Sequence, residues 1–447
     1  MPDICAFQYR YSSEEMRRLW SRENFLMKEI LVEASIVRGL EEAGIAPAGC
    51  WERVIKCGRG ITPQEVDEVE NSLGHETAAL AKVLESRCGP CGKYIHLGAT
   101  SNDIIDTATA LILKESLGIV KGKLRSVIEG LRRKASLYSD IVMVGRTHGQ
   151  HAVPITLGFK LMNYAYELSR SYERLCSAEE RVTRGKLAGA VGTMAAWGAA
   201  GLAVEDSALS NLGLAGHPIT TQVAPRDGYA ELIAVLAILA GQLDRFALEV
   251  RELSRPEIGE VETLHGRVGS STMPHKRNPA VAERVSGIAR FLRGLAVTAL
   301  ENIPLMHERD LTNSSAERIM LPHAMLAIDQ MLEDTVRLLE AFTPNREVME
   351  RNLRMSRGGI LSECFMVKAV LKGGMGRFKA HQKLSELTQK AVKEGKDLVE
   401  LIKESGGFSF LNEEDLASCS DPAEYLGSYR ELMERASRYV DDALRRC

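Results

Sequence analysis

Residues 104–131 read IIDTATALILKESLGIVKGKLRSVIEGL, and the spacing of their apolar side chains decides the fold class. Apolar residues recur at intervals of three and four, as at Ile104, Ala108 and Leu111, which is the period of one face of an α-helix. The pattern begins just after Thr100 and lasts for roughly thirty residues, longer than the usual globular helix. The stretch therefore predicts a long helix with a continuous buried face.

Four further segments carry the same helical pattern over comparable lengths. They span residues 155–183, 228–253, 279–300 and 315–342. Aromatic residues make up only 5% of the chain, so a β-sheet is not expected to dominate. Five long amphipathic helices predict an all-α fold built around a helical bundle. Helices with several apolar faces usually bury some of them against other subunits, so we expect an oligomer.

Breaks in the helical pattern predict three helical domains. The turn at His96-Leu97-Gly98 ends an N-terminal domain of residues 1–97. The break at Phe342-Thr343-Pro344-Asn345 ends a central bundle domain of residues 98–343. Residues 344–447 then form a smaller C-terminal helical domain.

Two short sequences predict helix starts in the N-terminal domain. Ser12-Ser13-Glu14-Glu15 reads as a capping box that opens the first helix. Thr62-Pro63-Gln64-Glu65 combines a Thr cap with Pro at the first helical position. Both signals agree with a helical domain.

Length and charge limit the class of protein. At 447 residues the chain exceeds a single ordinary core. Its 57 basic and 60 acidic residues are mixed along the chain and leave a net charge of −3, so a nucleic-acid partner is not predicted. The most apolar run, Leu232–Ala240, has about half of the length that a membrane span needs. Because the N-terminus also lacks a secretory pattern, we expect a cytoplasmic protein without a membrane partner.

Nine cysteines are many for a cytoplasmic protein. Cys88-Gly-Pro-Cys91 has the CxxC spacing, but no second CxxC or nearby His pair completes a zinc site. Free thiols are the ordinary state in a reducing cytosol. However, Asn and Gln are scarce while Arg and Glu are abundant, a bias reported for hyperthermophiles, whose intracellular proteins can be rich in disulfides. The sequence leaves open whether the thiols are free or form structural disulfides, and whether the source is thermophilic.

A polar loop, GSSTMPHKRNP, occupies residues 269–279. Pro274 and Pro279 exclude a regular helix there. The residues between them are potential cations and one amide: His275, Lys276, Arg277 and Asn278. Such side chains bind carboxylate or phosphate oxygens. We therefore interpret the segment as an anion-binding loop rather than as a solvated basic surface.

Three more polar clusters, residues 96–103, 145–151 and 307–318, lie at the ends of long helical patterns. His148 and His151 in the second cluster could exchange protons near neutral pH, which favours general acid or base chemistry. A metal site is not predicted there, because no HExxH or carboxylate partner lies at ligand spacing. The chain also lacks a GxSxG elbow, a Walker loop and a strand-linked GxGxxG, which argues against serine-hydrolase, ATP and dinucleotide chemistry.

The pattern Gly-Ser-Ser-x-Met-Pro-x-Lys-x-Asn-Pro at residues 269–279 resembles the signature loop of the fumarase/aspartase superfamily, whose members cleave C–N or C–O bonds to release fumarate. Within it, the His-Lys-Arg form of the loop and the sequence HERDLTNSSAER at residues 307–318 are similar to the adenylosuccinate lyase family. The resemblance runs from Arg10 to about Met325 and is weaker beyond. It implies an all-α homotetramer in which five long helices per subunit form a twenty-helix core, with each active site drawing on three subunits.

The resemblance also implies a reaction. Members of the adenylosuccinate lyase family release fumarate by non-hydrolytic β-elimination from adenylosuccinate, giving AMP, and from SAICAR, giving AICAR, in purine biosynthesis. The expected partners are these small nucleotides. No metal or organic cofactor is implied.

Residue roles carry over by motif from the same resemblance. Ser271 corresponds to the general base on the loop and His148 to the general acid, which Glu283 would support. Lys276 and Asn278 would bind the succinyl carboxylates. The other implied substrate-binding residues are Thr100, Ser101, Thr147 and Gln222 around the same moiety, His75 and His96 in the pocket, and Arg10, Tyr11, Arg309, Ser314 and Arg318 at the nucleotide and its phosphate. Such cations and donors suit a reaction in which a carbanion beside a carboxylate must be stabilised.

Three positions depart from the family pattern. Around His75, this chain has Gly74 where many members have Arg and Glu76 where many have Asp. Asn313 stands where many members have His. Two alternative functions were also weighed. A 3-carboxymuconate cycloisomerase-like enzyme shares the MPHKRNP sequence but needs no phosphate site. A non-catalytic helical scaffold would be expected to lose Ser271, His148 or Lys276, all of which are present.

Overall fold

The computed structural model describes residues 5–263 and 272–447, and helices dominate these ranges. The described chain divides into two compact units. Unit 1 comprises Met1–Leu124, Ser171–Leu243 and Gly287–Glu333, and unit 2 comprises Arg125–Arg170, Asp244–Ser286 and Asp334–Cys447. The predicted all-α fold class is confirmed. The predicted division into three domains stays a prediction.

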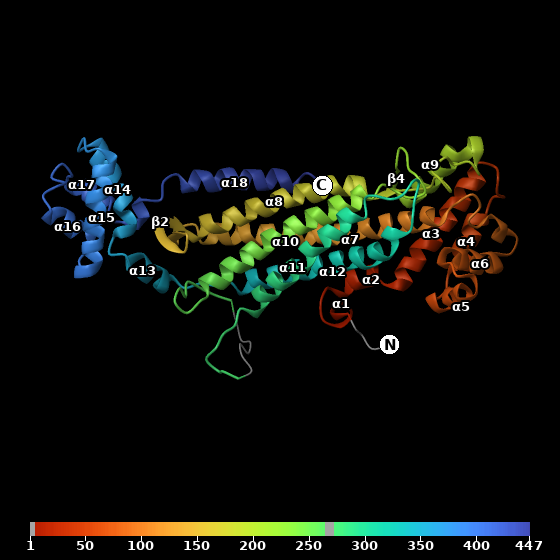
Figure 1. Cartoon of the computed structure of the whole chain (residues 1–447), viewed down its shortest axis with the longest axis horizontal. Helices are drawn as coiled ribbons and strands as arrows, with labels where there is room; N and C mark the ends of the chain where they lie inside the picture. The colour runs from red at the N-terminus through yellow and green to blue at the C-terminus, as the bar shows by residue number, and fades with distance from the viewer. Residues whose placement is uncertain (1–4, 264–271) are drawn as a thin grey trace. The chain divides into compact units, whose positions relative to one another are not determined.

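Unit 1 begins with a series of shorter helices, gathered in the red-to-orange part of the ribbon (Figure 1). They are α1 (Ala6–Tyr9), α2 (Glu14–Leu19), α3 (Arg22–Glu42), α4 (Cys50–Gly58), α5 (Pro63–Leu73), α6 (Glu76–Cys88) and the 3₁₀ turn η1 (Gly89–Tyr94). The cap of α5 is as predicted, because Thr62 accepts a hydrogen bond from the N–H of Glu65 and Pro63 follows it. The helix predicted to be the first of the chain is α2, because the short helix α1 precedes it. It is capped by Ser13, while the Ser12 hydroxyl donates to Asp329 (3.0 Å).

The N-terminal helices enclose a hydrophobic core that two disulfides reinforce. Side chains from α3 to α6 form this core, among them Ile30, Val54 and Leu84, which are at most 2% exposed. Disulfides join Cys50 to Cys91 and Cys57 to Cys88, so one face of α4 is linked to the end of α6 and to η1. The sequence left the state of these thiols open, and both residues of the CxxC pair are disulfide-bonded to α4.

The five predicted long helices are present with nearly the predicted bounds. They are α7 (Ser101–Leu137), α8 (Leu157–Val182), α10 (Asp227–Leu253), α11 (Ala280–Glu301) and α12 (Thr312–Ala341). Ile104, Ala108 and Leu111 are buried, as the apolar period requires. Within unit 1, Lys123 of α7 pairs with Asp329 of α12 (2.5 Å).

Close backbone packing joins α3 to α9 (Gly201–Leu212) in unit 1. A Cβ at Gly39 of α3 would lie 2.4 Å from the carbonyl oxygen of Val204, so only glycine permits this approach. The turn η2 (Gly198–Ala200) precedes α9, and the two-residue strands β3 (Arg184–Gly185) and β4 (Ala215–Gly216) pair in parallel beside it.

Unit 2 contains a β-hairpin and a pair of very short strands. The hairpin strands β1 (Val142–Thr147) and β2 (Gln150–Thr156) are antiparallel, and their register shifts between Val144 and Arg146. The strands β5 (Val261–Glu262) and β6 (Thr343–Pro344) are also antiparallel. These strands connect helices and form no layer of their own.

The C-terminal helices of unit 2 are short apart from α15 and α18, which have 18 and 16 residues. They are α13 (Arg346–Arg354), η3 (Gly359–Leu361), α14 (Ser362–Leu371), α15 (Arg377–Glu394), α16 (Leu398–Glu404), α17 (Glu413–Ser418), η4 (Pro422–Glu424) and α18 (Tyr429–Leu444). Phe365, Leu384, Leu398 and Ile402 form their common core. None of the helices in the described ranges is long and apolar enough to cross a membrane.

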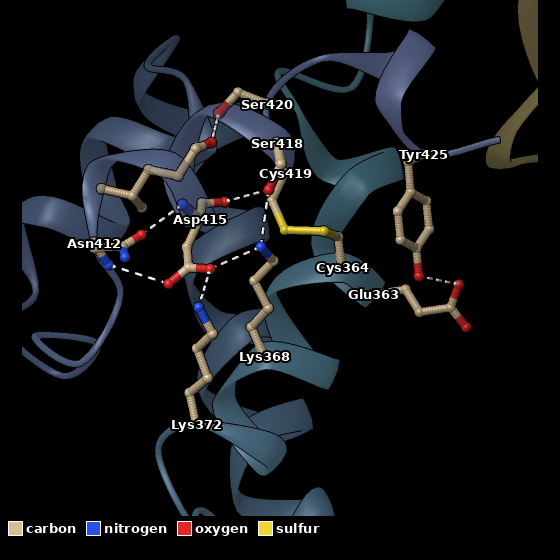
Figure 2. The surroundings of a disulfide bond; sticks show 11 residues. Glu363, Cys364, Lys368, Lys372, Asn412, Asp415, Ser418, Cys419, Ser420 and Tyr425 are labelled. Carbon is tan, nitrogen blue, oxygen red and sulfur yellow. Dashed lines mark hydrogen bonds and ion pairs between the residues drawn. A yellow bond between two sulfur atoms is a disulfide. The ribbon is translucent and has the colours of Figure 1, made fainter. Parts of the chain in front are cut away.

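A disulfide and an ion-pair cluster link α14 to α17 (Figure 2). Cys364 on α14 is bonded to Cys419 at the end of α17. Beside it, Lys368 and Lys372 of α14 both contact Oδ1 of Asp415, at 2.8 and 2.5 Å. The hydrogen bonds and charges of the two lysines lower the pKa of the nearly buried Asp415 carboxyl well below its usual range. A disulfide and two ion pairs therefore both hold α14 against α17.

Reduction is expected to lower the midpoint of thermal unfolding. A disulfide restricts the unfolded chain, and breaking it removes about 2–4 kcal/mol of stability. Scanning calorimetry with and without reductant measures this shift of the midpoint. A Cys364→Ser/Cys419→Ser double variant should show a smaller shift on reduction, because one of the disulfides is already missing. In a thiol titration under denaturing conditions, Cys5 should react without reductant, whereas the six cysteines paired above should not. Nine reactive thiols before reduction would contradict the pairings.

Candidate active site

Unit 1 contains a cavity of about 330 Å³ lined by residues from its short helices and its long helices. Three of the predicted nucleotide-binding residues, Arg309, Ser314 and Arg318, lie in its wall. The remaining lining residues are Trp20, Arg22, Phe25, Leu26, Glu29, Pro63, Val66, Glu76, Asn102, Ile105, Asp106, Thr109, Arg226, Tyr229, Asn313, Glu317, Leu321 and Pro322. The cavity thus combines cationic groups with aromatic and apolar surfaces.

A buried arginine ties together the elements around this cavity. Arg226, directly before α10, donates both Nη groups to Asp106 of α7 (2.8 and 3.0 Å). It also donates to Glu317 of α12, at 3.0 and 3.2 Å. Burial alone would raise the pKa of Asp106, but the Arg226 charge outweighs it and holds that pKa below its ordinary value. Because the two carboxylates neutralise a guanidinium that water does not reach, this cluster fixes three helices in one arrangement.

Arg309 and Gln222 are brought together within unit 1. Nη1 of Arg309 donates to Oε1 of Gln222 (3.0 Å), whose amide nitrogen donates to the carbonyl of Ala190 (3.0 Å). Burial lowers the pKa of Arg309, which nevertheless stays a cation. The predicted phosphate-binding residue Arg309 and the predicted succinyl-binding residue Gln222 are therefore neighbours.

Arg318 is held by an acidic side chain of the cavity wall. Its Nη1 lies 2.7 Å from Oε2 of Glu76, and the Arg318 side chain is 58% exposed. A phosphate group would compete with Glu76 for this guanidinium, because both offer two oxygens to the same donors. Ser314, half-buried one turn before Arg318, also faces the cavity.

Glu29 of α3 is a buried carboxyl group in the same cavity. It is 4% exposed, and burial together with the charge of Glu76 raises its pKa to about 8, although Arg318 opposes the rise. At neutral pH the group is therefore mostly protonated and can both donate and accept hydrogen bonds.

His96 forms a tight pair with a second buried glutamate of α3. Its Nδ1 lies 2.7 Å from Oε1 of Glu33, and its backbone N–H donates to Oε2 of Glu33 (3.0 Å). The backbone of His96 has a φ of 56°, an uncommon conformation for a non-glycine residue that these two bonds fix. Burial alone would lower the pKa of His96, but the hydrogen bond and charge of Glu33, with a smaller contribution from Asp103, raise it.

Thr100 and Ser101 lie at the N-terminus of α7, close along the chain to this pair. The N–H of Thr100 donates to Oδ2 of Asp103 (2.8 Å). Oδ1 of Asp103 accepts from the fully buried ammonium of Lys186 (2.6 Å) and from the N–H of Ala188 (2.8 Å). The residues predicted to surround the succinyl group thus rest on a buried ion pair.

The remaining predicted residues of unit 1 lie outside the cavity lining. His75 is the N-cap of α6, where its Nδ1 accepts from the N–H of Ala78 (3.4 Å), and its neighbour Glu76 faces the cavity instead. Arg10 is exposed, with its guanidinium 5.8 Å from the centre of the Tyr11 ring. Their roles in substrate binding stay predictions.

Unit 2 presents Thr147 and His148 at the tip of the β1–β2 hairpin. Both are exposed, and His148 and Gly149 form the turn with φ values of 55° and 73°. Below the tip, Arg146 makes a bidentate ion pair with the buried Glu260, at 2.8 and 2.7 Å. Asn352 adds a hydrogen bond to the same carboxylate (2.9 Å). The exposed imidazole of His148 is therefore carried on a rigid base.

Lys276, Asn278 and Glu283 also belong to unit 2. Lys276 is exposed and its backbone N–H donates to the carbonyl of Met273 (3.0 Å), Asn278 is half-buried, and Glu283 is exposed in the first turn of α11. Ser271, the predicted general base, lies outside the described residues. Within residues 5–263 and 272–447, no group of three or more His, Cys, Asp or Glu side chains is placed to hold a metal ion.

Sequence reasoning missed the buried charges, although the helical pattern contains a signal for them. Asp106, Glu29 and Glu33 each occupy a buried position of a helix, where a charge must be paired or neutralised. A charged residue on an otherwise apolar face therefore indicates a partner. The pattern cannot identify that partner, because Arg226 follows Asp106 by 120 residues.

Replacing Glu33 with Gln should lower the pKa of His96. The amide removes the negative charge that raises this pKa, while the burial that lowers it remains. In the parent, the pair stabilises the fold fully below the ordinary His pKa and loses this contribution as the pH rises through the raised pKa. NMR titration of the His96 ring measures the shift. Glu23→Gln, an exposed change on the same helix, is the control and should leave the pKa of His96 unchanged. An unchanged His96 pKa in Glu33→Gln would contradict the assignment.

Comparison with known sequences places the chain in a family. The family model described as Lyase matches residues 12–294, more than half of the chain, and the model described as Adenylosuccinate lyase C-terminus matches residues 358–436. A protein of Pyrococcus abyssi named adenylosuccinate lyase is 45% identical, with 99% of each chain covered. One of the same name from Methanothermobacter thermautotrophicus is 42% identical, covering 97% of this chain and 98% of the relative.

Solved structures agree at the level of the fold. The 3-carboxy-cis,cis-muconate lactonizing enzyme of Pseudomonas putida has a TM-score of 0.88 at 30% identity and covers 99% of this chain and 100% of its own. A fumarate lyase of Mesorhizobium has a TM-score of 0.86 at 28% identity, with 99% of both chains covered. Sequence identity over nearly the full length and the matching C-terminal model show that the chain belongs to the adenylosuccinate lyase family of C–N lyases, within the fumarase/aspartase superfamily.

Proposed function

We propose that the protein cleaves adenylosuccinate to AMP and fumarate, and SAICAR to AICAR and fumarate, by β-elimination. The observation that carries the proposal is the cavity of unit 1, which Arg309, Ser314 and Arg318 all line. Two cations and a hydroxyl in a partly apolar cavity suit a phosphate attached to a nucleoside. The names of the curated relatives support the same substrate.

In the proposed mechanism, Ser271 takes the proton from the succinyl carbon next to the carboxylate. The electron pair left on that carbon then forms the C=C bond of fumarate as the C–N bond to the adjacent carbon breaks. The pair of the C–N bond passes to the nitrogen, and His148 as imidazolium supplies the proton that this nitrogen needs. The charge that develops on the carboxylate is stabilised by Lys276 and Asn278. The exposure of His148 and Lys276 on their own elements supports this role, since a catalytic group must reach the substrate.

We also propose a cytoplasmic homotetramer in which active sites are shared between subunits. Exposed apolar side chains on the long helices support an oligomer. Examples are Ile238 of α10, Val297 of α11 and Ile319 of α12, which are 45%, 65% and 62% exposed. Helices of a soluble bundle expose few such residues unless another chain covers them.

A 3-carboxymuconate cycloisomerase-like reaction is the second candidate, because one solved structure of similar fold carries that activity in its name. Its substrate has no phosphate. The cationic cavity and the match to the adenylosuccinate lyase C-terminal model favour the first candidate.

Purified protein should release AMP and fumarate from adenylosuccinate without added metal or nucleotide cofactor. Ser271→Ala and His148→Gln should each lower kcat by about 10²–10⁴-fold, the usual contribution of a general acid or base. Ser270→Ala, in the same loop, is the matched control and should retain most of the activity. Absorbance and chromatography follow both products.

The outcomes separate the parts of the proposal. If Ser271→Ala still cleaves adenylosuccinate at the parent rate, the proposed reaction stands but the assignment of Ser271 as general base is wrong. Cleavage of 3-carboxymuconate with no cleavage of adenylosuccinate would support the second candidate.

A further inference from the structure

The cavity of unit 1 contains buried polar atoms that the folded chain does not satisfy. Within the described residues, four buried atoms that belong to lining residues have no hydrogen-bond partner: Oε1 of Glu29, Oδ1 of Asn102, Oδ1 of Asn313 and Nε of Arg309. Glu29, Asn102 and Asn313 are only 4%, 3% and 2% exposed. An unsatisfied buried polar group destabilises the folded chain. Four of them around one cavity indicate that a bound molecule completes the set.

In each of the two asparagines the side-chain oxygen, rather than the amide nitrogen, is the atom without a partner. Nδ2 of Asn102 donates to Asp106 (3.1 Å), and Nδ2 of Asn313 donates to Glu317 (2.9 Å). Both acceptors belong to the cluster around Arg226. Because that buried cluster holds each amide in one orientation, the free oxygen of each asparagine is fixed as an acceptor.

The rest of the lining restricts the kind of molecule that fits. Trp20, Phe25 and Tyr229 provide aromatic walls, and Arg309 and Arg318 provide cationic donors. The unsatisfied oxygens need a ligand with hydroxyl or N–H donors, and the aromatic walls suit a flat ring. A nucleoside phosphate has all three features: donors, a flat base and an anion.

We propose that Glu29, Asn102 and Asn313 bind the nucleoside part of the substrate, accepting hydrogen bonds from its ribose hydroxyls or base N–H groups. This inference rests on the proposed function and adds three residues to the site. All three side chains are more than nine-tenths buried, so each is held in place by the surrounding packing. Glu29 is a binding residue that determines affinity for the nucleoside, and it takes no part in the chemical step.

The protonation state of Glu29 gives the proposal a second observable. The groups that act on it are Glu33 and Arg22 of α3, Glu76 of α6 and Arg318 of α12. Asp106, Arg226, Arg309 and Glu317 also line the cavity. The raised pKa of about 8 keeps the carboxyl neutral at pH 7. Above pH 8 it ionises, which adds a negative charge close to the bound phosphate, so affinity should fall.

The test is calorimetric titration of the full-length protein with AMP at pH 7 and pH 9. Glu29→Leu should weaken AMP binding at pH 7 by about tenfold or more, the value of one lost hydrogen bond in a buried site. Glu29→Gln, which keeps an acceptor and a donor, should bind AMP at pH 7 nearly as the parent does and should lose less affinity at pH 9. Glu23→Gln, an exposed change on the same helix, is the control for α3.

Ribose 5-phosphate lacks the base, so it distinguishes ribose hydroxyls from base N–H groups as the hydrogen-bond donors to Glu29. If Glu29→Leu weakens AMP and ribose 5-phosphate alike, the ribose is the donor; if it weakens AMP alone, the base is. Unchanged AMP affinity in a folded Glu29→Leu, with the parent binding AMP, would overturn the inference and leave the proposed function standing. A parent that neither binds AMP nor cleaves adenylosuccinate would instead overturn the proposed function.

Discussion

The guanidinium of Arg226 is the buried charge on which the geometry of unit 1 depends. It is paired with Asp106 of α7 and Glu317 of α12, and removing one partner of such a buried pair typically costs about 3–5 kcal/mol. The same carboxylates hold the amides of Asn102 and Asn313, each one helical turn earlier. One charge therefore fixes three long helices and the orientation of two cavity side chains.

Unit 2 uses the same principle beneath its hairpin. The bidentate pair of Arg146 and Glu260, supported by Asn352, lies below an exposed tip that carries Thr147 and His148. Rigid support is what a site built on a loop needs, since a reactive group that moves loses effectiveness. In both units, side chains predicted to contact a ligand lie beside an ion pair whose carboxylate is buried, Asp106 in unit 1 and Glu260 in unit 2. The stability of the fold and the precision of the site thus have a common cause.

The period of the apolar residues was sufficient to predict the long helices, because each helix buries one continuous face. Position along the chain could not predict which residues meet across helices: nothing near Asp106 indicates Arg226, and nothing near Glu33 indicates His96. The local capping signals correctly predicted helix starts at Thr62 and within Ser12-Ser13-Glu14-Glu15, where Ser13 is the cap. They could not predict that the Ser12 hydroxyl bonds to Asp329 of α12. His96, Gln222 and Arg309 were identified through the family motif, whereas Glu29 belongs to no motif and became visible only through burial.

The two disulfides of the N-terminal helices constrain the order in which this region can fold. Cys88 and Cys91 are three residues apart, so in an unfolded chain they meet each other far more often than they meet α4, because short loops cost the least entropy to close. Yet each is bonded to a different turn of α4. Oxidation before α4 has docked would trap the local pair and exclude both native bonds. Hydrophobic packing of α4 on α6 before thiol oxidation therefore favours the two native bonds over the local pair.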